Sequence, residues 1–139
     1  MPVMNKELRV GDLMTLDPLV VDPEATIRDV EDLLKRNRVT GLPVMRAGTL
    51  VGVISQSDLV VARSSSVIGA NWTRLRVHHL MTAPAVTVHV GATIRLAARE
   101  MVSRHIHRLV VTDDDGIPVG VVTPLDLLRS LLDAPPSRS

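Results

Sequence analysis

Two stretches of the chain carry apolar residues at helical spacing on one face and charged residues on the other. Each stretch follows a threonine, Thr26 or Thr93, and threonine is a common helix N-cap. The spacing predicts amphipathic helices near residues 26–37 and 93–104. The apolar residues that set it are Ile27, Val30, Leu33 and Leu34 in the first stretch, and Ile94, Ala97, Ala98, Met101 and Val102 in the second.

Short runs rich in β-branched residues surround each predicted helix. One run precedes the helix and two follow it, with Ala-Gly at 47–48 or Asp-Asp-Asp-Gly at 113–116 as the turn between them. A shorter helix is then predicted near Asp58 and near Asp126. The order β-α-β-β-α, present twice, predicts an α/β fold with small sheets covered by helices. The predicted strands are 19–21, 42–45 and 50–54, and then 86–88, 109–112 and 119–122.

The chain repeats three sequence blocks in the same order. They are Leu-Met-Thr at 13–15 and 80–82, Ala-Thr-Ile-Arg at 25–28 and 92–95, and Gly-x-x-Ser/Thr-x-x-Asp at 52–58 and 120–126. The offset is 67 residues for the first two blocks and 68 for the third. We expect two tandem units that pack with pseudo-two-fold symmetry and hold a ligand in the cleft between them. Their expected bounds are 8–62 and 77–132, with a disordered tail at 133–139 and a linker at 63–76 whose pattern is too weak to assign a secondary structure.

The composition narrows the classes of function. The 139 residues include no Cys, Phe or Tyr and a single Trp, and the formal net charge is +1. Without cysteine, disulfides, thiolate catalysis and zinc–thiolate sites are excluded. Without surface aromatic rings or a strong positive field, neither nucleic acid nor a membrane surface is an expected partner. No signal peptide or transmembrane run stands out, so a cytoplasmic protein is expected.

The third repeated block combines a glycine, a hydroxyl and an acid where a predicted strand meets a helix. Ser55 with Asp58, and Thr123 with Asp126, have the spacing of a helix capping box, which by itself contributes about 1 kcal/mol to each helix. Pro124 at the first helical position supports this interpretation. The same geometry suits a nucleoside, because helix N–H groups attract phosphate and a carboxylate accepts hydrogen bonds from ribose hydroxyls. The glycine would let a flat ring approach the backbone.

Taken together, these motifs resemble a pair of CBS (cystathionine β-synthase) domains, the tandem called a Bateman module, over about residues 8–132. The resemblance rests on the Met-Thr starts, the Ala-Thr-Ile helix starts, Gly-Leu-Pro-Val at 41–44 and both Gly-x-x-Ser/Thr-x-x-Asp blocks. It implies a stand-alone regulatory module that binds AMP, ADP, ATP or S-adenosylmethionine between the repeats and signals to an unidentified effector protein. It also implies a homodimer formed by the helices near 26–37 or 93–104 and those after Asp58 and Asp126.

The resemblance also implies a set of ligand-binding residues. Asp58 or Asp126 would hold ribose, with Ser55 or Thr123 beside the ribose or phosphate, and Thr15 and Thr82 would each contribute a hydroxyl. The backbone at Val39 and Thr40, or at Ile106 and His107, would line the adenine slot. The segment 105–111 resembles the His-Arg-Leu segment in the γ subunit of AMP-activated protein kinase, which implies that His107 and Arg108 contact phosphate. In the family, such a pair can reach the phosphate of a nucleotide whose ribose the other repeat holds.

Three alternatives stay open beside the nucleotide-binding hypothesis. Arg108 can instead be a solvated charge at a strand edge. The protein can be a constitutive interaction module without a ligand. His105 and His107 can hold a metal, if they lie on one face of a strand that starts early. No nucleophile elbow, P-loop or complete dinucleotide loop appears, so the expectation is a protein that is not an enzyme and has no cofactor.

Overall fold

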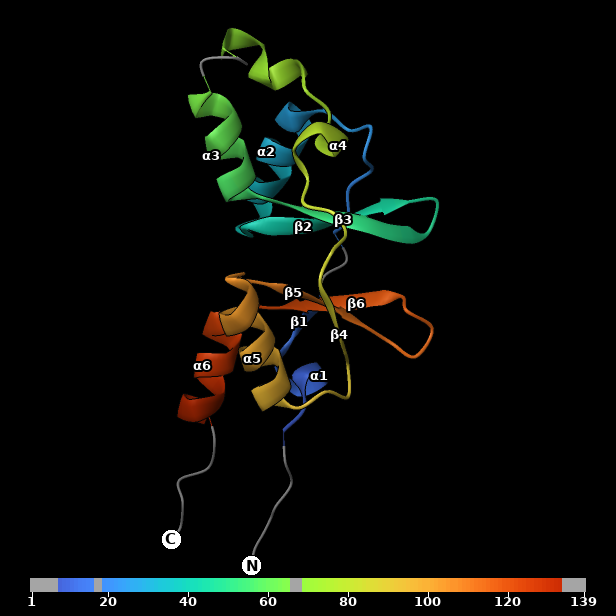
Figure 1. Cartoon of the computed structure of the whole chain (residues 1–139), viewed down its shortest axis with the longest axis vertical. Helices are drawn as coiled ribbons and strands as arrows, with labels where there is room; N and C mark the ends of the chain where they lie inside the picture. Colours follow the sequence, from blue (N-terminus) through green and yellow to red (C-terminus); the bar gives the residue numbers. More distant parts are fainter. Residues whose placement is uncertain (1–7, 17–18, 66–68, 134–139) are drawn as a thin grey trace, which may run out of the picture. The chain divides into compact units, whose positions relative to one another are not determined.

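The chain folds into two units, each with its own strands, helices and core (Figure 1). The structure is a computed structural model that describes residues 8–16, 19–65 and 69–133. The continuous unit spans 19–85, and the split unit combines the chain up to residue 18 with the chain from 86 onward. The units therefore do not follow the sequence period: the start of each repeat belongs to the unit that holds most of the other repeat. The repeat bounds 8–62 and 77–132 stay a prediction about the sequence.

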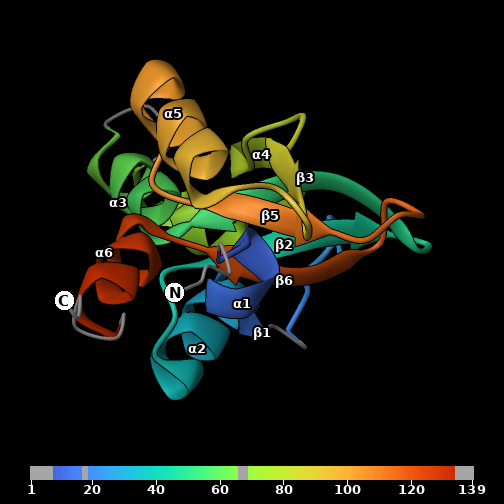
Figure 2. The ribbon, with the colours of Figure 1, turned by 90° about the horizontal axis from the view of Figure 1, so that it is seen from below.

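A four-stranded sheet organises the split unit, in the order β1-β6-β5-β4. β4 and β5 are parallel, and the other two pairs are antiparallel. Helices α1, α5 and α6 lie on one face of this sheet, as the views in Figures 1 and 2 agree. The elements are α1 (Val10–Leu13), β1 (Thr15–Leu16), β4 (Thr87–His89), α5 (Ile94–Arg104), β5 (Leu109–Thr112), β6 (Pro118–Val122) and α6 (Pro124–Asp133).

The continuous unit repeats this plan with shorter outer strands. Its β2–β3 hairpin is extended by single bridges, a parallel one from Val21 to Val44 and an antiparallel one from Val53 to Thr82. The resulting order matches that of the split unit, because Thr82 corresponds to Thr15 and Val21 to Val88. The elements are α2 (Ile27–Asn37), β2 (Gly41–Arg46), β3 (Thr49–Ser55), α3 (Gln56–Ser64), the 3₁₀ helix η1 (Gly69–Arg74) and α4 (Val77–Leu80).

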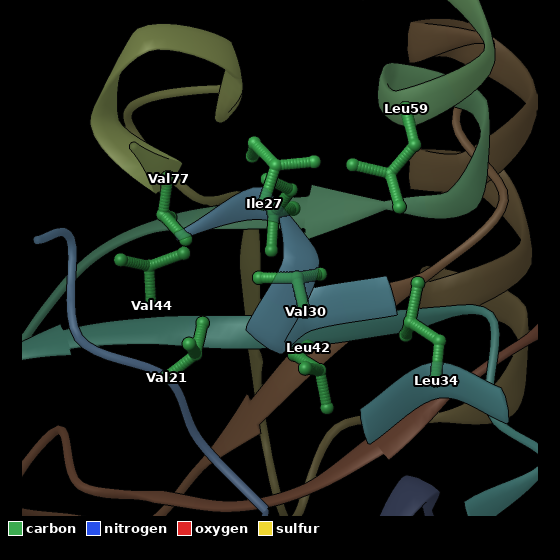
Figure 3. Packing of buried hydrophobic residues seen from close by; sticks show 9 residues of the cluster. Val21, Ile27, Val30, Leu34, Leu42, Val44, Leu59 and Val77 are labelled. Carbon is green, nitrogen blue, oxygen red and sulfur yellow. The ribbon is translucent and has the colours of Figure 1, made fainter. Parts of the chain in front are cut away.

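Both cores are aliphatic, as a chain without Phe or Tyr requires. In the continuous unit, Ile27 and Val30 of α2 pack against Leu42, Val44 and the other core residues of their unit (Figure 3). Complete burial of such a side chain contributes about 1.5–3 kcal/mol. The buried core of the split unit consists of Val10, Val88, Ala97, Met101, Leu109, Val111 and Val122.

The ends of the two long helices confirm the N-caps that the sequence predicts. Thr26 Oγ1 accepts a hydrogen bond from the Asp29 N–H at 3.1 Å, and Thr93 Oγ1 accepts one from the Leu96 N–H at 3.1 Å. Each helix ends at a residue in the left-handed region, Arg38 or His105, both with φ of 55°. This conformation turns the chain sharply from the helix into the strand that follows.

Several expectations can be compared directly with these elements. The two long helices and the hairpins are confirmed, whereas the four-residue helices α1 and α4 and the 3₁₀ helix η1 were not assigned from the sequence. The placement of His105 and His107 on one strand is wrong, because β5 starts at Leu109 and His105 ends α5. Asp133 closes α6, and the rest of the predicted tail, 134–139, lies outside the described residues.

None of the helices in the described part of the chain is long and apolar enough to cross a membrane. A cytoplasmic location stays a prediction.

The β2–β3 turn offers a test of the fold's local energetics. Ala47 has φ of 49° and Gly48 has φ of 83°, which are the positive values of a type I′ hairpin turn. Because asparagine tolerates this conformation better than alanine, Ala47→Asn should stabilise the protein by about 1 kcal/mol in urea unfolding. Gly48→Ala should destabilise it by about 1 kcal/mol, since no atom obstructs the new Cβ and only the backbone strain changes. A loss of stability in Ala47→Asn would contradict this account of the turn.

Candidate functional site

The residues that the sequence nominates separate into two sets, one in each unit. The continuous unit holds Val39, Thr40, Ser55, Asp58 and Thr82, and the split unit holds Thr15, Ile106, His107, Arg108, Thr123 and Asp126. Each set therefore combines the Met-Thr threonine of one repeat with the hydroxyl and acid of the other. The sequence signals did not predict this exchange, because a repeat offset says nothing about which copies pair.

Backbone pairing fixes each threonine close to the helix start of its own set. Thr82 and Val53 exchange two hydrogen bonds, of 2.8 and 3.0 Å, and Thr15 pairs with Val121 in the register of β1 and β6. Val53 and Val121 each lie two residues before the residue that caps the next helix. Both threonine side chains are exposed, so their hydroxyls are accessible to solvent.

The glycine of each motif is required by the segment that crosses it. A Cβ on Gly52 would lie 2.7 Å from the Thr82 carbonyl oxygen, and one on Gly120 would lie 2.8 Å from the Thr15 carbonyl oxygen. The sulfurs of Met81 and Met14 are also close, at 3.0 Å from the Gly52 position and 2.7 Å from the Gly120 position. The structure thus gives these glycines a packing role, where the sequence pattern had pointed to the approach of a flat ring.

Ser55 and Asp58 form a reciprocal cap at the start of α3. The Ser55 N–H and the Ser55 hydroxyl both donate to Asp58 Oδ2, at 2.8 and 3.0 Å, while the Asp58 N–H donates to Ser55 Oγ at 3.4 Å. A further contact of 2.9 Å joins the hydroxyls of Ser55 and Ser57. The cap uses one carboxylate oxygen and leaves Oδ1 of the half-buried Asp58 outside it.

Thr123 and Asp126 form the same cap at α6. The Thr123 N–H and hydroxyl donate to Asp126 Oδ2 at 2.9 and 3.1 Å, and the Asp126 N–H donates to Thr123 Oγ1 at 3.3 Å. Asp126 is only 5% exposed, and its Oδ1 lies 3.7 Å from Arg129 Nη1. The predicted capping role is confirmed at both helix starts, and Asp29 plays the same part in α2.

Each unit has a hollow between two of its helices, α5 and α6 in the split unit and α2 and α3 in the continuous unit. The two hollows occupy corresponding positions. The hollow of the split unit measures about 390 Å³ and is mostly apolar; its lining is Ala98, Met101, Val102, His105, Ile106, His107, Pro124 and Leu127. Its counterpart in the continuous unit measures about 160 Å³ and is bordered by charged side chains. There Arg63 of α3 pairs with Glu31 of α2 and lies over the Trp72 ring, 4.3 Å from its centroid.

The remaining candidates lie in the short segments that lead into β2 and β5. His107 is exposed and borders the larger hollow, and Arg108 is half-buried just before β5. Val39 borders the smaller hollow. In the described part of the chain, no group of three His, Asp or Glu side chains is placed to hold a metal ion.

Comparison with known proteins identifies the family. The model of the CBS domain matches residues 10–65 and 77–133, so the chain belongs to the CBS-domain family and consists of two such domains in tandem. Its mixed α/β architecture of two repeats is that of solved CBS-pair proteins.

Three known proteins illustrate what this chain is similar to. It is 28% identical to the uncharacterized protein MJ1426 of Methanocaldococcus jannaschii, over 94% of this chain and 98% of that protein. CBSX2 of Arabidopsis thaliana, solved in complex with AMP, is 33% identical with a TM-score of 0.77, over 89% of this chain and 96% of that one. The CBS domain pair of MJ0100, solved with 5′-methylthioadenosine and S-adenosyl-L-methionine, has a TM-score of 0.79 over 91% of this chain and 97% of that one. At 24% identity, the last similarity establishes the fold alone.

The crossing of the Met-Thr segments can be tested at the two glycines. Gly52→Ala and Gly120→Ala should each destabilise the protein by roughly 1–3 kcal/mol in urea unfolding, because the new methyl meets a backbone oxygen that cannot move aside. Gly91→Ala is the matched control: its Cβ would meet only the exposed His89 ring, at 3.2 Å, and should cost less. Equal losses in all three variants would show that the crossing imposes no special constraint.

Proposed function

We propose that this protein is a regulatory module that binds an adenine nucleotide, of the AMP, ADP or ATP type, at the starts of α3 and α6. The observation that carries the proposal is the arrangement at each helix start. A capped acid, a hydroxyl and the threonine of a crossing segment are collected there by the fold. The solved CBSX2 complex supports AMP as the type of ligand, since that relative shares a third of its residues with this chain.

The caps leave the acids able to bind ribose. Asp58 uses Oδ2 for its helix, and Oδ1 can accept a hydrogen bond from a ribose hydroxyl. At Asp126 the same oxygen lies near Arg129, so a ribose there would share it with a guanidinium. His107 and Arg108 are the groups that we assign to phosphate, because an arginine fork presents several donors and a permanent charge.

S-adenosylmethionine is the alternative ligand. It shares the adenosine part of AMP, so the ribose contacts proposed here would serve it equally. It lacks phosphate, and the anionic group that it could offer to Arg108 is the carboxylate of its methionine part. The structure of the MJ0100 pair with this ligand keeps the alternative in view, although its identity to this chain carries only the fold.

The proposed role is regulatory rather than catalytic. The Ser55 and Thr123 hydroxyls donate to the acids of their own caps, which suits helix termini better than nucleophiles. We propose that the module works in the cytoplasm, with no cofactor apart from the regulatory nucleotide. Its signal would pass to an effector protein or through its own assembly.

We further propose that a second copy of the chain docks on the α5–α6 face of the split unit. That face carries both projecting apolar side chains and a hollow. When a two-fold axis relates two copies, the projecting side chains of each copy can fill the hollow of the other. The projecting residues are Val102, Leu125, Leu128, Leu131 and Leu132, which are 56–84% exposed. In the continuous unit the position of Leu131 is taken by Arg63, which pairs with Glu31 and stacks on Trp72 within its own chain.

Nucleotide binding should depend on both acids beyond their role as caps. Asp58→Ala and Asp126→Ala should each weaken AMP binding at one site roughly ten- to hundredfold, which is the loss of one charge-assisted hydrogen bond. Calorimetric titration with AMP measures this directly.

The matched control is Asp29→Ala, which removes the same kind of cap from α2. It should lower the melting temperature while leaving AMP affinity as in the wild type. If the three variants lose stability alike and none loses affinity, the acids are caps only. If AMP, ADP, ATP and S-adenosylmethionine all leave the wild-type melting temperature unchanged, the protein is a ligand-free interaction module.

Self-association should depend on the α5–α6 face. In light scattering at micromolar concentrations we expect twice the 15.1 kDa mass of one chain for the wild type, and a monomer for Leu131→Asp, because the new carboxylate would be buried without a partner. Val61→Asp places the same charge on α3, at a side chain that is 69% exposed, and should remain dimeric. A monomeric wild type, or a dimeric Leu131→Asp, would rule out this interface.

A further inference from the structure

The short helices α1 and α4 begin with the same backbone hydrogen bond but with different acceptors. In α1, the Arg9 N–H donates to Asp12 Oδ2 at 2.7 Å. In α4, the Arg76 N–H donates to His79 Nδ1 at 3.0 Å, and His79 follows Asp12 by the repeat offset of 67 residues. A carboxylate accepts hydrogen bonds throughout the neutral range of pH, whereas the ring of a histidine accepts only while it is neutral. The start of α4 therefore has an acceptor that a proton can remove.

The surroundings of His79 match a neutral ring. Because a backbone N–H can only donate, Nδ1 must keep its lone pair, and the ring proton lies on Nε2. In the described part of the chain no carboxylate pairs with this ring; its ring neighbour is His78, which Glu24 contacts at 3.7 Å. Asp58 and Arg63 of α3, which packs against α4, already have partners within the continuous unit. The charged and titratable groups on the elements around His79 are Glu24, Asp58, Arg63, Arg74, Arg76 and His78.

The cap at His79 belongs to the crossing segment of the continuous unit. The first residue of α4, Val77, is fully buried in the core (Figure 3), and the segment continues to Thr82, which pairs with Val53. Protonation would place an N–H on Nδ1 opposite the Arg76 N–H, so the folded state would lose a hydrogen bond that the unfolded chain never had. The unfolded chain therefore takes up the proton more readily. This contribution to stability is present above the range in which histidine titrates and is lost below it.

The second repeat makes the same replacement at His89. Its Nδ1 accepts the Gly91 N–H at 2.9 Å, where the corresponding Asp22 accepts a backbone N–H at 2.8 Å. His89 differs from His79 at its other nitrogen, since Nε2 lies 2.6 Å from Asp114 Oδ1. That carboxylate favours the charged ring and offsets the lost hydrogen bond. The sensitivity to protons therefore falls on His79.

We infer that His79 is a proton-sensitive cap, which holds the start of the crossing segment near neutral pH and weakens it in mild acid. Its side chain is exposed, so it exchanges protons freely with the solvent. The continuous unit should therefore lose stability on acidification through a contact that Asp12 keeps intact in the split unit.

The test follows the melting temperature of the full chain at about pH 7.5 and about pH 5.5, on either side of the range in which histidine titrates. Each variant is its own reference, so any constant cost of the substitution cancels. His79→Asn and His79→Asp keep an acceptor that does not titrate in this range, and each should lose about 3–5 °C less than the wild type on acidification. Using two variants guards against a folding defect in one.

Two further variants separate the cap from the general charge of the region. His78→Asn, which removes the adjacent ring, is the matched control and should lose as much as the wild type. Asp12→His places a histidine cap in α1 and should lose about 3–5 °C more than the wild type.

The role of His79 is wrong if both of its variants lose as much as the wild type, or if His78→Asn removes the loss. It is equally wrong if Asp12→His melts with the pH dependence of the wild type. No nucleotide enters these measurements, so their outcome is separate from that of the proposed function.

Discussion

The fold depends on a pair of backbone crossings in which the start of one repeat lies over a glycine of the other. The crossing segment completes the sheet through Thr15 or Thr82, and its short helix places a fully buried valine, Val10 or Val77, in the core. The glycine is what allows the approach, since any side chain there would strike a carbonyl oxygen. Each crossing segment therefore gives its unit an outer sheet pairing, a buried core valine and a threonine hydroxyl.

The two units share this backbone arrangement and differ in the side chains on their outer helices. In the continuous unit, Arg63 is satisfied within the chain by Glu31 and the Trp72 ring, and the linker helix η1 packs on α2 and α3. In the split unit, the corresponding helix, α6, carries exposed leucines, and the neighbouring hollow is larger and mostly apolar. The caps at the helix starts are alike in the two units, whereas the outer helix surfaces and the hollows differ.

Much of this architecture could be predicted from sequence because it is encoded locally. Helical periodicity after Thr26 and Thr93, and turn residues between β-branched runs, are short-range signals with a direct physical cause. The capping boxes at Asp58 and Asp126 are equally local, and they are present as expected. The family followed from these same blocks.

The features that sequence reasoning missed are those set by distant contacts. Four-residue helices such as α1 have too few turns for a periodic signal, and the exchange that brings Thr15 to Thr123 depends on packing across many intervening residues. The alternative that placed His105 and His107 on one strand fails because His105 adopts a left-handed conformation that ends α5, which is uncommon for a residue other than glycine.

The split unit has a consequence for how the protein forms during synthesis. Residues 19–85 are contiguous and contain every buried residue of their core. The continuous unit is therefore fully synthesised before the second part of the split unit exists. The segment that carries Val10 and Thr15, although made before residues 19–85, has no partner strand until β6 is made. Closing so long a separation is slow compared with local folding. The segment that is synthesised before the continuous unit is therefore the one that finds its place after that unit has folded.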